Sequence, residues 1–305
     1  MNRIRLQAYG KINLSLDVLR QRPNGYHDVR MIMQTVKLHD NIDMERTDTP
    51  GIVLKTNLPF LPVNENNLMY RAAKMLMDEF HLEGGVRMSL RKVIPVAAGM
   101  AGGSADAAAV LYGMNRLFDL RLSLEELKKR GVQLGADIPF CLMRGTALSE
   151  GIGEILTPLP ALPACSIVLA KPAISVSTKA VYENLHVNTL PAEAHPDVDQ
   201  VIEALKAQDV RAVAGRMGNI LETVTSRQHP EIDAIKERMM ALGALNAMMS
   251  GSGPTVFGLF DDPEKAQACY RALLSAKGKG IAKQVYLTEP WLQPSRTSPS
   301  RPARL

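Results

Sequence analysis

The chain has 305 residues, 46% of them hydrophobic, which is enough for about two globular domains. No apolar stretch approaches the length of a membrane span, and the amino terminus lacks the apolar core of a signal peptide. The three cysteines lie far apart in sequence, which argues against a zinc cluster or a disulfide framework and favours a reducing compartment. We therefore expect a cytoplasmic protein of two domains without a membrane anchor.

Much of the positive charge lies at the carboxyl end. The net charge is +5, and residues 291–305 hold Arg296, Arg301 and Arg304 but no acid. The basic balance is therefore weak evidence for a nucleic-acid surface. The proline, serine and arginine content of this segment predicts a disordered basic tail that takes no part in catalysis.

The amino-terminal half predicts a sheet with helices. Apolar and polar residues alternate from Ile12 to Val18, which predicts a strand with one buried face. Asn24-Gly25 predicts the turn after it, and Ser123 predicts a helix start. Strands are predicted over residues 3–19, 29–38, 42–45, 52–56, 86–93 and 145–156, and helices over 67–80 and 122–134.

The carboxyl-terminal half predicts more helix. Three prolines between residues 156 and 163 predict a domain junction or a surface crossing. We expect domains over residues 1–157 and 158–290, followed by the tail over 291–305. Strands are predicted over residues 166–170, 247–250, 255–260 and 282–287, and helices over 177–185, 198–207, 210–226, 231–242 and 263–276.

Three glycines, Gly99, Gly102 and Gly103, precede a predicted helix whose apolar residues recur at spacings of three and four. Ser104 or Asp106 is expected to cap its first turn. A glycine loop before a helix start offers free N–H groups and a favourable dipole to an anion. The sequence has neither a Walker loop nor a dinucleotide fingerprint. The stretch predicts a phosphate site of another kind, with a plain loop before a core helix as the alternative.

Four shorter motifs accompany this stretch. They are Tyr9-Gly-Lys-Ile-Asn13, Asn24-Gly-Tyr-His27, Gly135-Ala-Asp-Ile-Pro-Phe140 and Gly251-Ser-Gly-Pro254. Each alone has an ordinary explanation, namely a surface lysine, an exposed turn histidine, a turn carboxylate and a tight turn. Pro139 is expected to exclude regular helix from the third.

Together these motifs resemble the GHMP kinases, over residues 4–287. Residues 95–105 resemble the family's second motif and residues 251–254 its third. The resemblance implies an α+β fold in two parts, a domain like the second domain of ribosomal protein S5 followed by a ferredoxin-like domain. It implies ATP and Mg²⁺ as cofactors and a substrate cleft between the two parts.

The motifs around Lys11, His27 and Asp137 resemble one branch of this family. Its members phosphorylate the 2-hydroxyl of a cytidyl-linked methylerythritol in the non-mevalonate isoprenoid pathway. By this resemblance Asp137 is the catalytic aspartate, and Lys11 pairs with it near the acceptor hydroxyl. The chemistry is consistent, because a carboxylate can accept the hydroxyl proton and a lysine can keep that carboxylate ionised.

The resemblance also assigns binding roles. The cytidyl end of the substrate is held by Asn13, Tyr26, His27 and Tyr182, the last stacking on the base. The ATP loop consists of Pro95, Val96, Ala97, Ala98, Gly99, Met100, Ala101, Gly102, Gly103, Ser104 and Ala105, and Asn66 borders the adenine.

Some points stay open at this level. Ala105 stands where several relatives have a second serine, so the metal ligands are undetermined. Another GHMP kinase acting on a different small alcohol is the nearest alternative, and an RNA-binding protein with the S5-like fold is a second. Few aromatic residues and a body without a basic stripe argue against RNA. We expect a monomer or weak homodimer that binds neither nucleic acid nor membrane.

Overall fold

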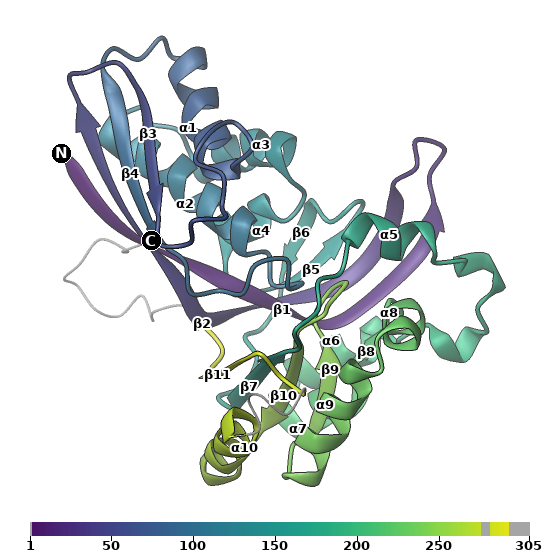
Figure 1. Ribbon diagram of the computed structural model, residues 1–305. Coiled ribbons are helices and arrows are strands. Elements are labelled where there is room, and N and C mark those ends of the chain that lie inside the picture. Colours follow the sequence, from purple (N-terminus) through teal and green to yellow (C-terminus); the bar gives the residue numbers. More distant parts are fainter. Residues whose placement is uncertain (1, 276–280, 293–305) are drawn as a thin grey trace.

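The computed structural model describes residues 2–275 and 281–292. Within them the chain forms two sheets with helices on their faces, and a long hairpin runs across the molecule (Figure 1). The predicted α+β class and two-part architecture are confirmed. None of the helices in the described ranges combines the length and apolarity needed to cross a membrane.

The first sheet is built on that hairpin, in which β1 (Arg3–Gln21) and β2 (His27–Thr47) pair antiparallel. The strand order is β3 (Gly51–Thr56), β4 (Gly85–Arg91), β2, β1 and β8 (Gly218–Asn219), with β5 (Thr146–Glu150) on β2 and β6 (Ile155–Pro158) on β5. Four helices pack beside this sheet, namely α1 (Leu68–Glu79), α2 (Gly102–Leu117), α3 (Leu124–Leu134) and α4 (Ile138–Met143). The helices α2 and α4 contact β1 directly.

Strand β2 is longer and β1 more buried than predicted. The separate strands predicted over 29–38 and 42–45 are one strand, and the pairing of β1 with β2 shifts register between Tyr9 and Lys11. Every residue from Gly10 to Val18 is buried. The alternation of apolar and polar residues predicts one buried face for this strand. Both of its faces are buried because helices from both halves contact it, including α6 (Val198–Lys206) and α7 (Val210–Arg216).

The start of α2 differs from the prediction. The helix begins at Gly102 behind Ala101, which has a left-handed backbone with φ 54° and forms no side-chain cap bond. Ser104 and Asp106 therefore lie inside the first turns, and the prediction that either caps the helix is wrong. Asp106 instead forms a buried ion pair with Lys92.

The prediction of no regular helix around Pro139 is also wrong. Pro139 lies in the first turn of α4, where its missing N–H would have had no helical partner. Asp137 is the residue before this helix. The predicted cap at Ser123 is confirmed, since Ser123 and Glu126 form a capping box at the start of α3.

The second sheet has the ferredoxin-like arrangement. Its strands are β7 (Ser166–Lys171), β9 (Asn246–Met249), β10 (Val256–Phe260) and β11 (Gln284–Thr288), all antiparallel in the order β11-β7-β10-β9. The helices α9 (Glu231–Ala241) and α10 (Pro263–Ser275) pack against it. The predicted end of the last helix at residue 276 lies outside the described residues.

The segment between β7 and α9 connects the two sheets. It contains α5 (Thr178–Glu183), the short helices η1 (Val187–Thr189) and η2 (Ala192–Ala194), α6, α7 and α8 (Glu222–Gln228). The helix predicted over 210–226 is broken, because β8 intervenes and pairs parallel with Ser15 and Leu16. Gly218, just after α7 and in β8, favours the break, since glycine disfavours helix interiors. The first sheet thus takes a strand from beyond the expected boundary at 157.

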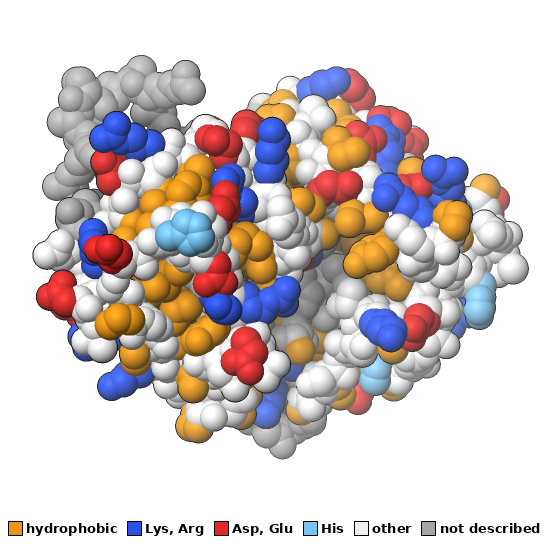
Figure 2. Space-filling view, turned by 90° about the horizontal axis from the view of Figure 1, so that it is seen from above, with side chains coloured by type: hydrophobic (Ala, Val, Ile, Leu, Met, Phe, Trp, Pro, Cys, Tyr) orange, Lys and Arg blue, Asp and Glu red, His pale blue; other side chains and the backbone are white. Residues whose placement is uncertain are grey.

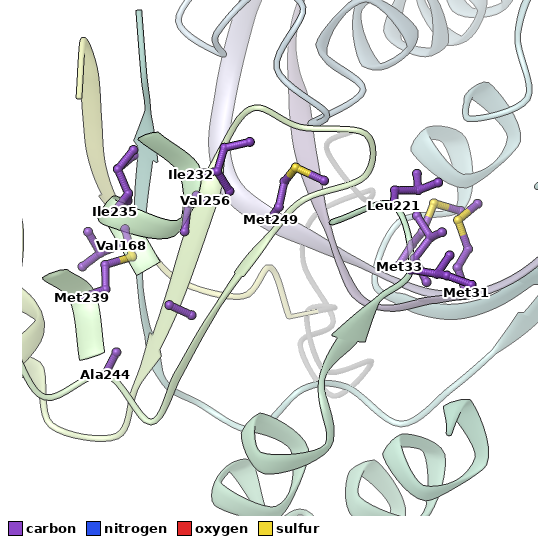
Figure 3. Packing of buried hydrophobic residues seen from close by; sticks show 14 of the residues in the cluster. Met31, Met33, Val168, Leu221, Ile232, Ile235, Met239, Ala244, Met249 and Val256 are labelled. Carbon is purple, nitrogen blue, oxygen red and sulfur yellow. The ribbon is translucent and has the colours of Figure 1, made fainter. Parts of the chain in front are cut away.

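The largest hydrophobic cluster likewise spans both halves. In Figure 3, side chains of α9 lie near strands β7 and β10, while Met31 and Met33 of β2 lie beside Leu221. The α9 side chains are Ile232, Ile235 and Met239, and the strand residues are Val168 and Val256. The two halves of the molecule therefore share one hydrophobic core.

Most of the predicted tail, residues 293–305, lies outside the described residues. Trp291 was expected to begin the disordered tail, but it packs against β2. Its backbone N–H donates to the Thr35 carbonyl at 2.8 Å, and the preceding Pro290 forms a β-bridge with Val36.

Candidate active site

A cavity of about 1030 Å³ lies between the two halves. Figure 2 shows the molecule hollowed between two raised masses. The glycine loop and the start of α2 form one wall, and the β1–β2 turn with α5 forms the opposite wall. Gly251 and Ser252 complete the lining from the second sheet.

The glycine loop is held close to the turn after β9. The carbonyl of Gly99 accepts bonds from Lys11 Nζ and Ser250 Oγ, each at 3.0 Å. Gly99 has a φ of 72°, and a Cβ added there would lie 2.0 Å from the Ser250 carbonyl. Only glycine fits this approach. The two glycine motifs, more than 140 residues apart in sequence, therefore meet at one site.

Asn219 fixes the turn that carries Gly251. Its Nδ2 donates to the carbonyls of Met249 and Gly251 at 2.9 and 2.8 Å. Asn219 lies in β8, which is paired to β1. One amide side chain thus ties the turn of the second sheet to the strand that carries Lys11.

Lys11 is a buried cation at the floor of the cavity. It is 5% exposed, and its Nζ donates to Asn13 Oδ1 at 2.6 Å as well as to Gly99. Burial lowers the pKa of Lys11, while attraction to Asp137 and to Cys141 acts in the opposite direction. Lys11 and Asp137 both line the cavity and interact electrostatically, but within the described ranges no ion pair of 4.0 Å or less joins them.

The opposite wall is aromatic. The rings of His27 and Tyr182 have centroids 5.1 Å apart at 42°. Burial lowers the pKa of His27, which favours the neutral imidazole near pH 7. Tyr26, in the turn before β2, is 59% exposed. Because two rings in contact lie about 4.5–7 Å apart, His27 and Tyr182 touch, and a base enters between them only if they separate.

The structure brings most of the predicted site residues to the cavity. Lining residues among them are Lys11, Tyr26, His27, Asn66, Pro95, Val96, Ala97, Ala98, Gly99, Ala101, Gly102, Gly103, Ser104, Asp137 and Tyr182. Met100 and Ala105 are buried behind the loop, and Asn13 lies behind Lys11, fully buried, with its Oδ1 occupied by the ammonium. Asn13 therefore contacts Lys11 where the sequence predicted a contact with the cytosine.

Sequence reasoning missed a buried ion cluster of Asp40, Lys92 and Asp106 beneath the loop. Lys92 Nζ donates to Asp40 Oδ2 at 2.6 Å and to Asp106 Oδ2 at 2.7 Å. Asp40 Oδ1 also accepts from the N–H groups of Val93 and Ile94, directly before the loop. Burial raises the pKa of Asp106 well above its ordinary value, and Lys92 opposes that shift. The sequence does carry one sign of this cluster, because Asp106 is a carboxylate within the alanine-rich buried face of α2.

Comparisons with known proteins agree with this geometry. The family models described as GHMP kinases N terminal domain and GHMP kinases C terminal match residues 67–145 and 182–280. The chain is 57% identical over 289 residues to a Lachnospira eligens protein, a match that covers 95% of this chain and 99% of that one. The chain belongs to the GHMP kinase family.

Two similar relatives within that family carry the same name. The Lachnospira eligens protein and one from Lachnoclostridium phytofermentans, 55% identical over 94% of this chain and 97% of that one, are both named 4-diphosphocytidyl-2-C-methyl-D-erythritol kinase. A crystal structure of 4-(cytidine 5'-diphospho)-2C-methyl-D-erythritol kinase is 32% identical, with a TM-score of 0.78 over 94% of this chain and 99% of that one.

Proposed function

We propose that this protein transfers the γ-phosphoryl group of ATP to the 2-hydroxyl of 4-diphosphocytidyl-2-C-methyl-D-erythritol, a step of the non-mevalonate isoprenoid pathway. The named relatives support the substrate. The observation that carries the proposal is that one cavity joins the glycine loop to the His27–Tyr182 wall, with Lys11 and Asp137 between them.

Phosphoryl transfer needs positioning and charge stabilisation more than covalent chemistry from the protein. In this proposal Asp137 accepts the proton of the acceptor hydroxyl, and Lys11 stabilises the charge on that oxygen. The buried position of Lys11 strengthens its interaction with a developing anion, because the surrounding dielectric is low. The contacts to Asn13 and Gly99 hold the ammonium in place before the substrates arrive.

Membership of the family implies ATP as the phosphoryl donor. The loop glycines and the first N–H groups of α2 would bind its phosphates. We propose Mg²⁺ as the companion cation, which would neutralise charge on the phosphates when bound. Across the described residues no group of three or more His, Cys, Asp or Glu side chains could hold a metal. In this proposal the ion would be held mainly by phosphate oxygens and water, as Mg²⁺ commonly is, with the Ser104 hydroxyl as a candidate protein ligand.

The cytidyl end would bind at the aromatic wall. His27 offers both a stacking face and hydrogen-bonding edges, and Tyr182 extends the stacking surface. Tyr26 lies in the exposed turn above them. The wall and the anion loop are made of different residues of the same cavity, so base recognition and phosphate binding would use separate side chains.

A phosphoryl-transfer assay over a panel of small alcohols tests the proposal. The cytidyl-linked methylerythritol should be phosphorylated with a kcat/KM above that of methylerythritol phosphate by roughly 5- to 150-fold for each base contact, because one such contact contributes about 1–3 kcal/mol. Equal rates with homoserine or mevalonate would assign the chain to another activity of its family.

A further inference from the structure

A buried arginine that does not line the active-site cavity lies against two aromatic rings. The guanidinium of Arg144 is 4.7 Å from the ring centroid of Tyr9 and 5.7 Å from that of Trp291. The two rings are themselves 6.0 Å apart. We call these three side chains the arginine clamp.

The elements that meet at the clamp also carry the proposed catalytic residues. Arg144 is the residue that ends α4, and Asp137 is the residue that precedes it. Tyr9 lies in β1, two residues before Lys11 and next to the register shift. Helix α4 has six residues, or about 9 Å at the usual rise, so movement of one end is transmitted to the other.

The third member comes from the far end of the chain. The N–H of Lys37 donates to the Glu289 carbonyl at 2.9 Å, and the N–H of Trp291 donates to the Thr35 carbonyl at 2.8 Å. The side chains of Lys37 and Glu289 form an ion pair as well. Residues 289–291 are thereby fastened along β2, which presents the Trp291 ring to Arg144.

Arg144 has unusual surroundings for a guanidinium. It is 8% exposed, its Nη2 donates to the Gln7 carbonyl at 3.0 Å, its Nε has no hydrogen-bond partner among residues 2–275 and 281–292, and no carboxylate in those ranges forms an ion pair with it. Burial lowers the pKa of Arg144. A buried cation without an anionic partner is costly, and aromatic faces partly replace the lost hydration. The two rings therefore help to hold Arg144 in this position.

We propose that Trp291 is a positioning residue for phosphoryl transfer, because it closes the clamp that sets the position of α4, and hence of Asp137, relative to β1 and Lys11. The inference rests on the proposed roles of Lys11 and Asp137. Displacement of a reacting group by about 1 Å can lower a rate by as much as about 100-fold. Loss of one clamp ring should therefore lower kcat while leaving both substrate-binding walls in place.

The kinetic test replaces Trp291 and its exposed neighbour. Trp291→Ala should lower kcat by about tenfold, with KM for ATP and for the cytidyl substrate changed by less than about twofold. Trp291→Phe should restore most of kcat because it retains a ring. Leu292→Ala, 44% exposed in the native chain, is the matched control and should behave as the native protein. A chain ending at Leu292 should keep full activity, whereas one ending at Pro290 should not.

A spectroscopic test follows the clamp without relying on catalysis. Trp291 is the only tryptophan of the chain, so its fluorescence reports on this site alone. Arg144→Ala should raise the acrylamide quenching constant at least about twofold, because the ring loses its partner, and Leu292→Ala should not. Thermal unfolding of each variant shows whether it is folded at the assay temperature.

Two results would overturn the proposal. One is a native kcat for Trp291→Ala in folded protein. The other is a loss of kcat that Trp291→Phe fails to restore. A third outcome separates the two proposals. If quenching confirms the contact between Trp291 and Arg144 but Asp137→Asn keeps native activity, the catalytic role of Asp137 is wrong and the arginine clamp has only a structural role.

Discussion

The two ends of the active-site cavity are built differently. At the phosphate end, backbone groups of the glycine loop are held by buried charges, namely Lys11 below and the Asp40, Lys92 and Asp106 cluster behind. At the cytidyl end, the wall consists of Tyr26 in an exposed turn, the buried His27 at the start of β2 and Tyr182 on the six-residue helix α5. Substitutions at the phosphate end should therefore affect folding or turnover. Substitutions at the cytidyl end should instead affect the affinity for one substrate.

The largest effect is expected at Asp137, between the two ends. Asp137→Asn retains the size of the side chain but removes the base, so kcat should fall by roughly 10²–10⁴-fold. Binding of ATP, measured by calorimetry, should be retained because the loop is untouched. An Asn variant with near-native kcat would remove the base from this mechanism.

The buried cluster at the phosphate end should dominate stability. Lys92→Met leaves two buried carboxyl groups without their cation, which should lower the free energy of unfolding by about 3–5 kcal/mol in urea titrations. Lys74→Met is the matched control, since Lys74 pairs with Asp78 on the surface of α1. Its effect should stay within about 0.5 kcal/mol. Equal losses for the two variants would contradict the special role of the buried cluster.

At the cytidyl end, His27→Ala should weaken the cytidyl substrate by roughly 1–3 kcal/mol, the scale of one base-stacking contact. The KM for ATP should hardly change. The exposed His81, which follows α1, provides a control whose replacement by alanine should change neither constant. A similar rise in both KM values for His27→Ala would show that the two ends are not separate.

The smallest effect concerns pH. Because the pKa of Asp106 is raised in the folded state, its contribution to stability is complete below its ordinary pKa of 3.8 and is lost as pH rises through the raised value. Asp106→Asn removes this titration. In urea titrations across that window, the variant should therefore gain stability relative to the native protein as pH increases. A difference between the two proteins that does not vary with pH would contradict the assignment.

Sequence patterns predicted the parts of the fold that depend on neighbours in the chain, such as the helix start at Ser123. The ferredoxin-like order of the second sheet followed from the resemblance to the family. The resemblance of motifs also assigned Lys11, Gly99 and Asp137 to one site, and the structure places all three in the lining of one cavity. Their catalytic roles stay predictions.

What sequence could not predict depends on contacts between distant segments. Asp106 looked like a helix cap because capping and buried pairing use the same residue type, and only its contact with Lys92 distinguishes them. Asp40 lies 52 residues before Lys92 and belongs to no motif. Trp291 resembled the start of a disordered tail because its partners, Tyr9 and Arg144, come from the other half of the chain.

The most direct measurement of the central claim is a double-mutant cycle on Lys11 and Asp137, with kcat measured for Lys11→Ala, Asp137→Asn and the pair. If the two act as one unit on the acceptor hydroxyl, the double variant should be only slightly slower than the slower single variant, because such residues are strongly non-additive. Fully additive losses in kcat would show that Lys11 and Asp137 act independently and would contradict the account.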